Sequence, residues 1–171
     1  MFVVSHVDLD RLQHFTEVLV RHAPAELTIG LVGTLGAGKT TLTQCLAEAA
    51  GVDRDDVTSP TFTLMSTYQA TIHAGTVALH HLDAYRLADE DEFLELGVEE
   101  LFESAKTWVL IEWADRVESV MPESTLWIEI DIDAEDAPLH RRKLTLRYHA
   151  DADSWIQRLR HDMDDSMNER S

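Results

Sequence analysis

One short segment restricts the possible fold more than any other. Residues Gly33–Thr40 read G-T-L-G-A-G-K-T and fit the phosphate-binding pattern G-x-x-x-x-G-K-[S/T]. The apolar run Leu27–Val32 comes directly before and is typical of a buried strand. Thr41–Ala50 favours a helix, which Gly51 is placed to end. The order strand, glycine-rich loop, helix predicts a P-loop, and a glycine-rich turn without a ligand is the alternative.

The chemistry of such a loop follows from its residue types. Glycines let the backbone point successive N–H groups at a polyphosphate, and the start of the following helix directs its positive end at the anion. Lys39 would add a positive charge at the β and γ phosphates. The hydroxyl of Thr40 would be offered to Mg²⁺. The segment therefore predicts a nucleotide-binding protein.

Length and charge limit what else the chain can do. With 171 residues, 44% of them hydrophobic, it has enough apolar side chains for one core, and we expect a single domain over residues 1–161. The polar segment 162–171 is predicted to be a disordered tail. A net charge of −18 argues against a large nucleic-acid surface on this chain, so a partner would have to handle any RNA.

Cysteine content and hydropathy favour a cytoplasmic protein. Cys45 is the only cysteine, so no intrachain disulfide can form, and we expect it to be a small core residue. No basic segment followed by an apolar stretch opens the sequence, and no apolar run is long enough to span a bilayer. We therefore expect no membrane contact.

Strands and helices are predicted to alternate along the rest of the chain. Helices are expected over residues 9–20, 89–96 and 151–161, with a helical turn at 99–102. Further strands are expected at 2–4, 61–68, 76–82, 107–111, 125–130 and 142–148, and the second and third of these would form a hairpin. This order predicts an α/β fold, a P-loop NTPase-like three-layer sandwich. Its central sheet would be mostly parallel, with an added antiparallel hairpin.

A P-loop needs a second acidic group to hold Mg²⁺, and two carboxylates follow predicted strands. Glu112 ends the apolar run 107–111, while Asp83 ends the hairpin strand. Spacing alone favours Glu112, because its strand is the more buried. His80 and His81 are neighbours on a strand, so their side chains point to opposite faces and are not expected to share a metal ion.

Four separate blocks of sequence make the prediction specific. They are G-T-L-G-A-G-K-T-T at 33–41, S-P-T-F-T-L at 59–64, H-L-D-A-Y-R-L at 81–87 and I-E-W at 111–113. In this order and at these separations the blocks resemble the TsaE (YjeE) family of small bacterial ATPases. The resemblance implies Mg²⁺-dependent ATP hydrolysis that supports TsaD and TsaB in forming threonylcarbamoyladenosine beside the anticodon of tRNAs. It also implies that hydrolysis is weak without these partners, and that tRNA is met only indirectly.

The resemblance also assigns roles to residues. Lys39 would hold phosphate, Asp83 would position the attacking water, and Thr61 would lie in a switch-like segment near the γ phosphate, while Thr40 and Glu112 would hold Mg²⁺. The nucleotide-binding loop would comprise Gly33, Leu35, Gly36, Ala37, Gly38, Lys39, Thr40 and Thr41. One departure is Thr34, where the family usually has Asp. The negative charge of that Asp, and any contact it makes, is missing here.

Three other functions fit part of the pattern. A small-molecule kinase would use the same loop but usually has an arginine-bearing lid, and no arginine-rich insertion occurs here. A GTPase would need an N-K-x-D element, which is missing after the loop. A nucleotide-gated binding module with incidental hydrolysis would need the loop and Glu112 but not Asp83.

Overall fold

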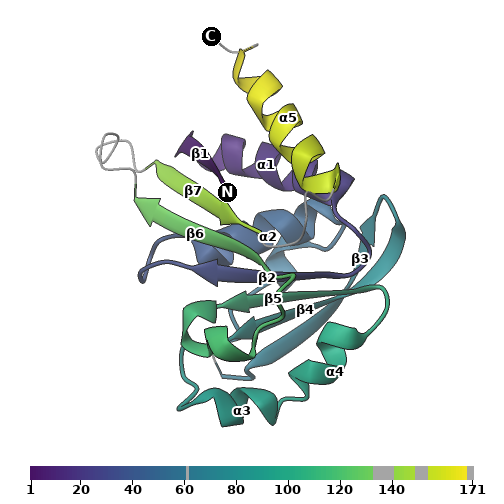
Figure 1. Ribbon diagram of the computed structural model, residues 1–171, viewed down its shortest axis with the longest axis vertical. Coiled ribbons are helices and arrows are strands. Elements are labelled where there is room, and N and C mark those ends of the chain that lie inside the picture. Colours follow the sequence, from purple (N-terminus) through teal and green to yellow (C-terminus); the bar gives the residue numbers. More distant parts are fainter. Residues whose placement is uncertain (61, 133–140, 149–153, 169–171) are drawn as a thin grey trace.

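A computed structural model describes residues 1–60, 62–132, 141–148 and 154–168. Over these residues a seven-stranded sheet runs through the molecule, with helices on both sides (Figure 1). In spatial order its strands are β1 (Phe2–Val7), β7 (Arg142–Arg147), β6 (Leu126–Ile132), β2 (Leu27–Val32), β5 (Thr107–Glu112), β4 (Gly75–Asp83) and β3 (Met65–Ile72).

The four central strands β6, β2, β5 and β4 are parallel, and β3 joins β4 as an antiparallel hairpin. This confirms the predicted sheet with its added hairpin. At the other edge β7 is antiparallel to both β6 and β1. The direction of this pair could not be taken from the sequence, because each strand is short and half exposed.

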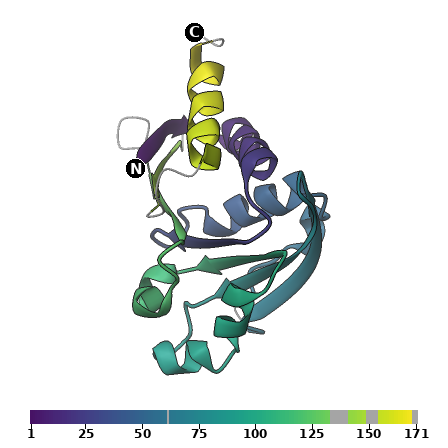
Figure 2. The same cartoon turned by 45° about the vertical axis from the view of Figure 1, so that its right-hand side comes forward.

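Helices cover the two faces of the sheet as separate layers. One face packs against α1 (Leu9–His22), α2 (Lys39–Ala49) and α5 (Ser154–Asn168). The other packs against α3 (Glu90–Leu94), α4 (Val98–Glu103) and the 3₁₀ helix η2 (Ala114–Val120). A second 3₁₀ helix, η1 (Arg54–Asp56), follows α2. Figure 2 shows α5 beside α1, at the end of the molecule opposite α3 and α4.

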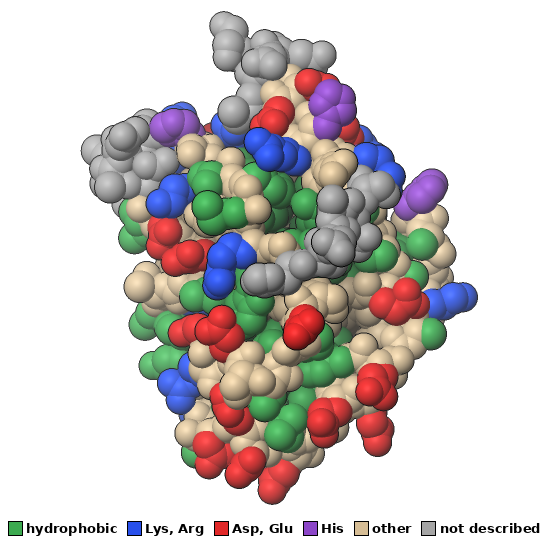
Figure 3. All heavy atoms as spheres, in the orientation of Figure 1, with side chains coloured by type: hydrophobic (Ala, Val, Ile, Leu, Met, Phe, Trp, Pro, Cys, Tyr) green, Lys and Arg blue, Asp and Glu red, His purple; other side chains and the backbone are tan. Residues whose placement is uncertain are grey.

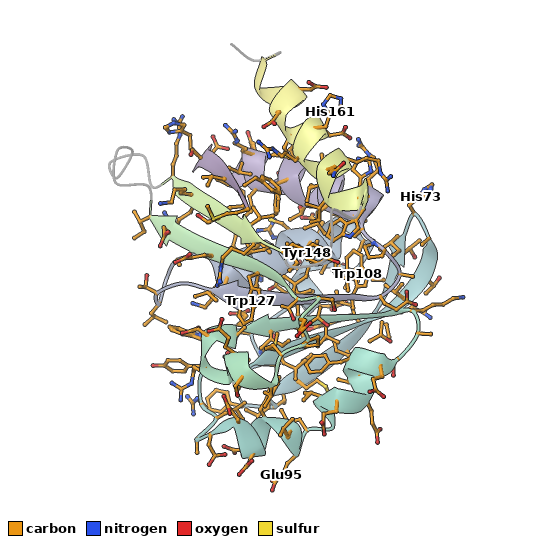
Figure 4. The ribbon with its side chains drawn as sticks, viewed as in Figure 1. His73, Glu95, Trp108, Trp127, Tyr148 and His161 are labelled. Atoms are coloured by element: carbon orange, nitrogen blue, oxygen red, sulfur yellow. The ribbon has the colours of Figure 1, made fainter. Side chains whose placement is uncertain are left out.

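Strand β5 explains how one short segment serves both layers. Its side chains alternate, so that Trp108 and Leu110 enter the core on the α2 side while Val109 and Ile111 enter the core on the other side. All six residues of the strand are buried, as expected for a central parallel strand. The Trp108 indole donates to Pro24 O at 2.9 Å, and the ring lies in the interior, whereas His73 lies at the exposed tip of the β3–β4 hairpin (Figure 4).

The predicted tail is wrong over residues 162–168. Helix α5 continues to Asn168 instead of ending at His161. Met163, which is 3% exposed, extends the apolar stripe of Trp155 and Leu159 by one more turn. Asp162 accepts a hydrogen bond from His22 of α1 at 2.8 Å. The polar composition of residues 162–168 gave no indication of a helix, because among the described side chains only one residue per turn of α5 is buried.

Smaller expectations agree with the structure. The Asp8 side chain caps α1 by accepting from Arg11 N at 2.9 Å, and Cys45 is buried in the core. Among the helices of the described residues, none combines the length and apolar character needed to cross a bilayer.

Candidate nucleotide-binding site

The site lies where the carboxyl ends of β2, β4 and β5 meet. The loop after β2 leads into α2, while Asp83 ends β4 and Glu112 ends β5, paired in register. Side chains at positions 81, 83 and 112 share the sheet face that carries α2, because each is an even number of residues from a strand neighbour in that core. Strand polarity therefore brings residues that are far apart in sequence to one edge.

The backbone of the loop leaves the start of α2 open. Gly38 caps the helix in the left-handed conformation with φ of +113°, and no side chain within the described residues caps it. The first N–H groups of a helix have no partner within the helix, and the first backbone bond here is Leu42 N to Gly38 O at 2.9 Å. A Cβ at Gly33 would lie 2.6 Å from Ile130 O, so only glycine fits there. This arrangement suits an anion.

Lys39 is buried against the loop that it follows. Its Nζ donates to Gly33 O at 2.7 Å and Thr34 O at 3.1 Å, and lies 3.6 Å from the centroid of the Trp113 ring. Burial lowers the pKa of Lys39, while the negative charges of Glu112, Asp115 and Asp83 oppose that shift. The lysine is thus a positive charge removed from water, where its attraction to phosphate is least screened.

Thr40 and Glu112 meet across 72 residues of sequence. The Thr40 hydroxyl donates to Glu112 Oε2 at 2.9 Å, and the carboxyl group is nearly buried at 3% exposure. Hydroxyl and carboxylate oxygens are ligands that Mg²⁺ accepts, and this ion commonly uses one or two carboxylates together with phosphate and water. The donor set fits Mg²⁺. No cluster of three or more His, Cys, Asp or Glu side chains suited to a metal occurs in the part of the chain that the structure describes.

Asp83 is held on both carboxylate oxygens. Ser59 Oγ donates to Oδ2 at 2.7 Å, and the backbone N–H of Tyr85 donates to Oδ1 at 2.9 Å. The Tyr85 ring in turn lies 4.9 Å from the Trp113 ring, centroid to centroid. The acidic group is therefore fixed in place by the segments on either side of it.

A cleft of about 410 Å³ joins these groups and is large enough for a small ligand. Its walls come from the loop, from α2 and from the ends of β4 and β5, and comprise Leu35, Gly36, Gly38, Lys39, Thr40, Thr41, Ser59, Asp83, Tyr85, Glu112 and Trp113.

A second cavity of about 190 Å³ lies on the other side of the loop. Apolar side chains including Leu12, Leu42 and Leu144 line it, together with the loop residues 36–38. Arg142 of β7 borders this cavity and its Nε donates to Ala37 O at 2.7 Å. The loop is thus bordered by a polar cleft and by a smaller, mostly apolar cavity.

The structure brings together most residues predicted for the site. Lys39, Thr40, Asp83 and Glu112 line one cleft, together with the predicted loop residues Leu35, Gly36, Gly38 and Thr41. Gly33 does not line it, and Ala37 lines the smaller cavity. Thr61 lies outside the described residues. At position 34 the backbone carbonyl, not the side chain, contacts Lys39. The roles of these residues stay predictions.

Three contributions were missed from the sequence. His81 Nε2 lies 2.9 Å from Glu112 Oε1, Ser59 donates to Asp83, and Arg142 contacts the loop from a distant strand. A signal existed for His81, because it lies two residues before Asp83 and hence on the same strand face. Arg142 carried no local signal, since its contact spans 105 residues.

Comparison with known proteins agrees with the geometry. The family model described as "Threonylcarbamoyl adenosine biosynthesis protein TsaE" matches residues 6–144. A Haemophilus influenzae protein named tRNA threonylcarbamoyladenosine biosynthesis protein TsaE is 36% identical over 118 residues, 68% of this chain and 71% of that protein. Its Bacillus subtilis namesake is 42% identical over 106 residues, 62% of each chain. The solved structure titled "Crystal structure of Bacillus subtilus YdiB" superposes with a TM-score of 0.69 and 25% identity, covering 96% of this chain and 95% of that one.

Proposed function

The chain belongs to the TsaE family, and we propose that within tRNA threonylcarbamoyladenosine biosynthesis it acts as a Mg²⁺-dependent ATPase. The observation that carries this proposal is the contact between Thr40 and Glu112 beside an open helix start and a buried lysine. This cleft offers partners that phosphate, Mg²⁺ and a water molecule would each require.

The loop would hold the phosphates through its backbone. Amides from Leu35 to Thr40 and the Lys39 amine would contact the β and γ phosphates, while Thr40 and Glu112 would hold Mg²⁺. The ion would neutralise charge that develops on the phosphate oxygens. The carbonyl contacts of Lys39 orient its amine at the loop before any ligand arrives.

Asp83 would place the attacking water. Hydrolysis forms a bond from a water oxygen to the γ phosphorus and breaks the bond from that phosphorus to ADP, and the water gives up a proton to phosphate or solvent. An acidic group fixed by two hydrogen bonds suits this task, since the reaction depends on positioning and electrostatics more than on covalent help.

The adenine base would occupy the smaller cavity beside residues 36–38. Its largely apolar lining, and the residues Gly36, Gly38 and Thr41 that it shares with the polar cleft, suit a flat, weakly polar ring joined to a charged chain. The sequence after the loop has no N-K-x-D element that would contact guanine.

Partner proteins complete the proposal. TsaD and TsaB homologues would assemble with this chain, and tRNA would be bound through them, because the net charge of −18 disfavours direct contact with RNA. A cytoplasmic location and weak hydrolysis in the absence of partners are parts of the same proposal.

Titration calorimetry with ATP and MgCl₂, followed by measurement of phosphate release, tests the function. The wild-type chain and the surface variant Lys143→Ala should bind alike, whereas Lys39→Ala should bind about 10-fold or more weakly, because a hydrogen bond to a charged group is lost. Recovered TsaD and TsaB homologues should accelerate phosphate release. Absence of binding by the wild-type chain refutes the proposal, and phosphate transfer to a small acceptor in place of free phosphate would favour a kinase.

A further inference from the structure

His81 is a buried polar side chain directly beneath the proposed Mg²⁺ site. It lies in β4, two residues before Asp83, and is 0% exposed. In the sheet it pairs in register with Leu110 of β5 and Ser66 of β3, and its side chain enters the layer on the α2 side. An apolar side chain would fill such a position at lower cost, because a buried polar group needs a partner.

The imidazole finds its partner in Glu112. Its Nε2 lies 2.9 Å from Glu112 Oε1, while Glu112 Oε2 accepts from Thr40. An ionised carboxylate can only accept, so Nε2 is the donor in this pair. The other ring nitrogen, Nδ1, is buried and has no hydrogen-bond partner among the described residues. The hydrogen bond to Glu112 is thus the one polar contact that this structure gives the ring.

In this geometry the two oxygens of the Glu112 carboxylate have different partners. Oε1 is held from the sheet side by His81, and Oε2 faces the hydroxyl of Thr40. We propose that His81 is a positioning residue, which holds Glu112 so that Oε2 stays beside Thr40 where Mg²⁺ would bind. The proposal rests on the proposed function. It matches the general behaviour of ligating carboxylates, which are oriented by hydrogen bonds from surrounding residues.

Lys39 supplies a reason why such a restraint is needed. It is a buried cation close enough for the charge of Glu112 to act on it. Without the imidazole, only Thr40 among the described residues would hold the carboxylate, and attraction to the ammonium group would favour a turn of Glu112 towards Lys39. Such a turn would draw the carboxylate away from Mg²⁺. His81 keeps the two opposite charges in separate roles.

The adjacent histidine offers a matched control. His80 points to the opposite face of the sheet, where its Nδ1 lies 2.9 Å from Thr67 Oγ1. A substitution there changes a histidine on the same strand but leaves the carboxylate untouched.

The test measures ADP affinity by calorimetry, once in EDTA and once in MgCl₂. Mg²⁺ should increase the ADP affinity of the wild type and of His80→Gln by the same factor. His81→Leu should keep the affinity in EDTA within about twofold but lose about tenfold or more of the gain from Mg²⁺. His81→Gln, which retains an N–H donor, should keep more of that gain than the leucine variant. A purely structural role would lower both affinities together.

Other outcomes separate the two proposals. A folded His81→Leu chain with the full Mg²⁺ gain overturns the role of His81 alone. A wild-type chain that binds no ADP, or binds it equally with and without Mg²⁺, overturns the proposed function, and the inference falls with it. Should His81→Leu fail to fold, ¹⁵N NMR of the wild type decides: a proton on Nε2 supports the pairing, and a bare Nε2 overturns it.

Discussion

Asp83 carries the most specific expectation for a single residue. Asparagine at this position can still accept from the Tyr85 N–H and contact Ser59, so its geometry should survive while its charge is lost. We expect Asp83→Asn to reduce phosphate release about 100-fold or more, with ADP affinity changed by less than about threefold. Parallel assays of hydrolysis and binding measure the two effects.

The exposed Asp91→Asn change on α3 is the control, since it alters the same charge far from the cleft. Unchanged hydrolysis in the Asp83 variant would contradict its role. Retained tRNA modification by a variant that has lost hydrolysis would instead favour a nucleotide-gated binding module.

The residues of the site differ in how far the sequence could reveal them. Lys39 and Thr40 belong to a contiguous motif, and Glu112 follows an apolar strand, so local pattern was sufficient. The contact of His81 with Glu112 requires two strands in a known register, which no local pattern supplies. Arg142 reaches the loop only because β7 lies between β1 and β6 in the sheet, a placement that no local pattern predicts.

At the level of elements, helix α5 makes a clear prediction. Met163 is 3% exposed in a segment that was expected to be a tail. We expect Met163→Ala to lower the free energy of unfolding by about 2–5 kcal/mol, because it leaves a cavity in the core. The exposed neighbour Asp164→Ala should change it by less than about 0.5 kcal/mol. Urea titrations followed by circular dichroism measure the free energy of unfolding of both variants. Equal losses in the two variants would mean that the end of the helix is not packed against the core.

The contact between α1 and α5 predicts a pH dependence. Hydrogen bonding from His22 lowers the pKa of Asp162 below its ordinary value of 3.8. A carboxyl group with a lowered pKa stabilises the fold at higher pH, and that contribution is lost as the pH falls through its pKa in the folded chain. The stability difference between wild type and Asp162→Asn should therefore shrink as the pH falls from about 5 to below 3.8. Thermal unfolding across this range measures it, and a difference that grows on acidification contradicts the expectation.

Elements were predictable where their periodicity was strong. The strand before the loop and the buried strand β5 are continuous apolar runs, and their predicted bounds agree with the structure to within one residue. The hairpin was predicted correctly as a motif, but its first strand is Met65–Ile72 instead of 61–68. Two outcomes depended on tertiary packing instead. The antiparallel pairing of β1 with β7 joins opposite ends of the chain, and the last turns of α5 are stabilised by contacts with α1 that their own composition does not disclose.

For the molecule as a whole, the net negative charge is expected to limit direct binding of polyanions such as tRNA. Exposed acidic side chains gather at the end formed by α3 and α4 (Figure 3). They are Asp91, Glu92, Glu95, Glu99, Glu100 and Glu103.

With a net charge of −18, we expect the purified chain to bind tRNA more weakly than about 100 µM at physiological salt. Fluorescence anisotropy with labelled tRNA measures this, and the same assay with TsaD and TsaB homologues present is the comparison. Micromolar binding by the chain alone, weakening steeply with added salt, would contradict the indirect role.

The contact from Arg142 to the loop carbonyl of Ala37 extends the influence of the site to the outer sheet. This hydrogen bond links the loop to β7, so we expect a change that loosens one to loosen the other as well. A substitution that destabilises β7 would therefore first weaken phosphate binding, at temperatures where the chain is still folded.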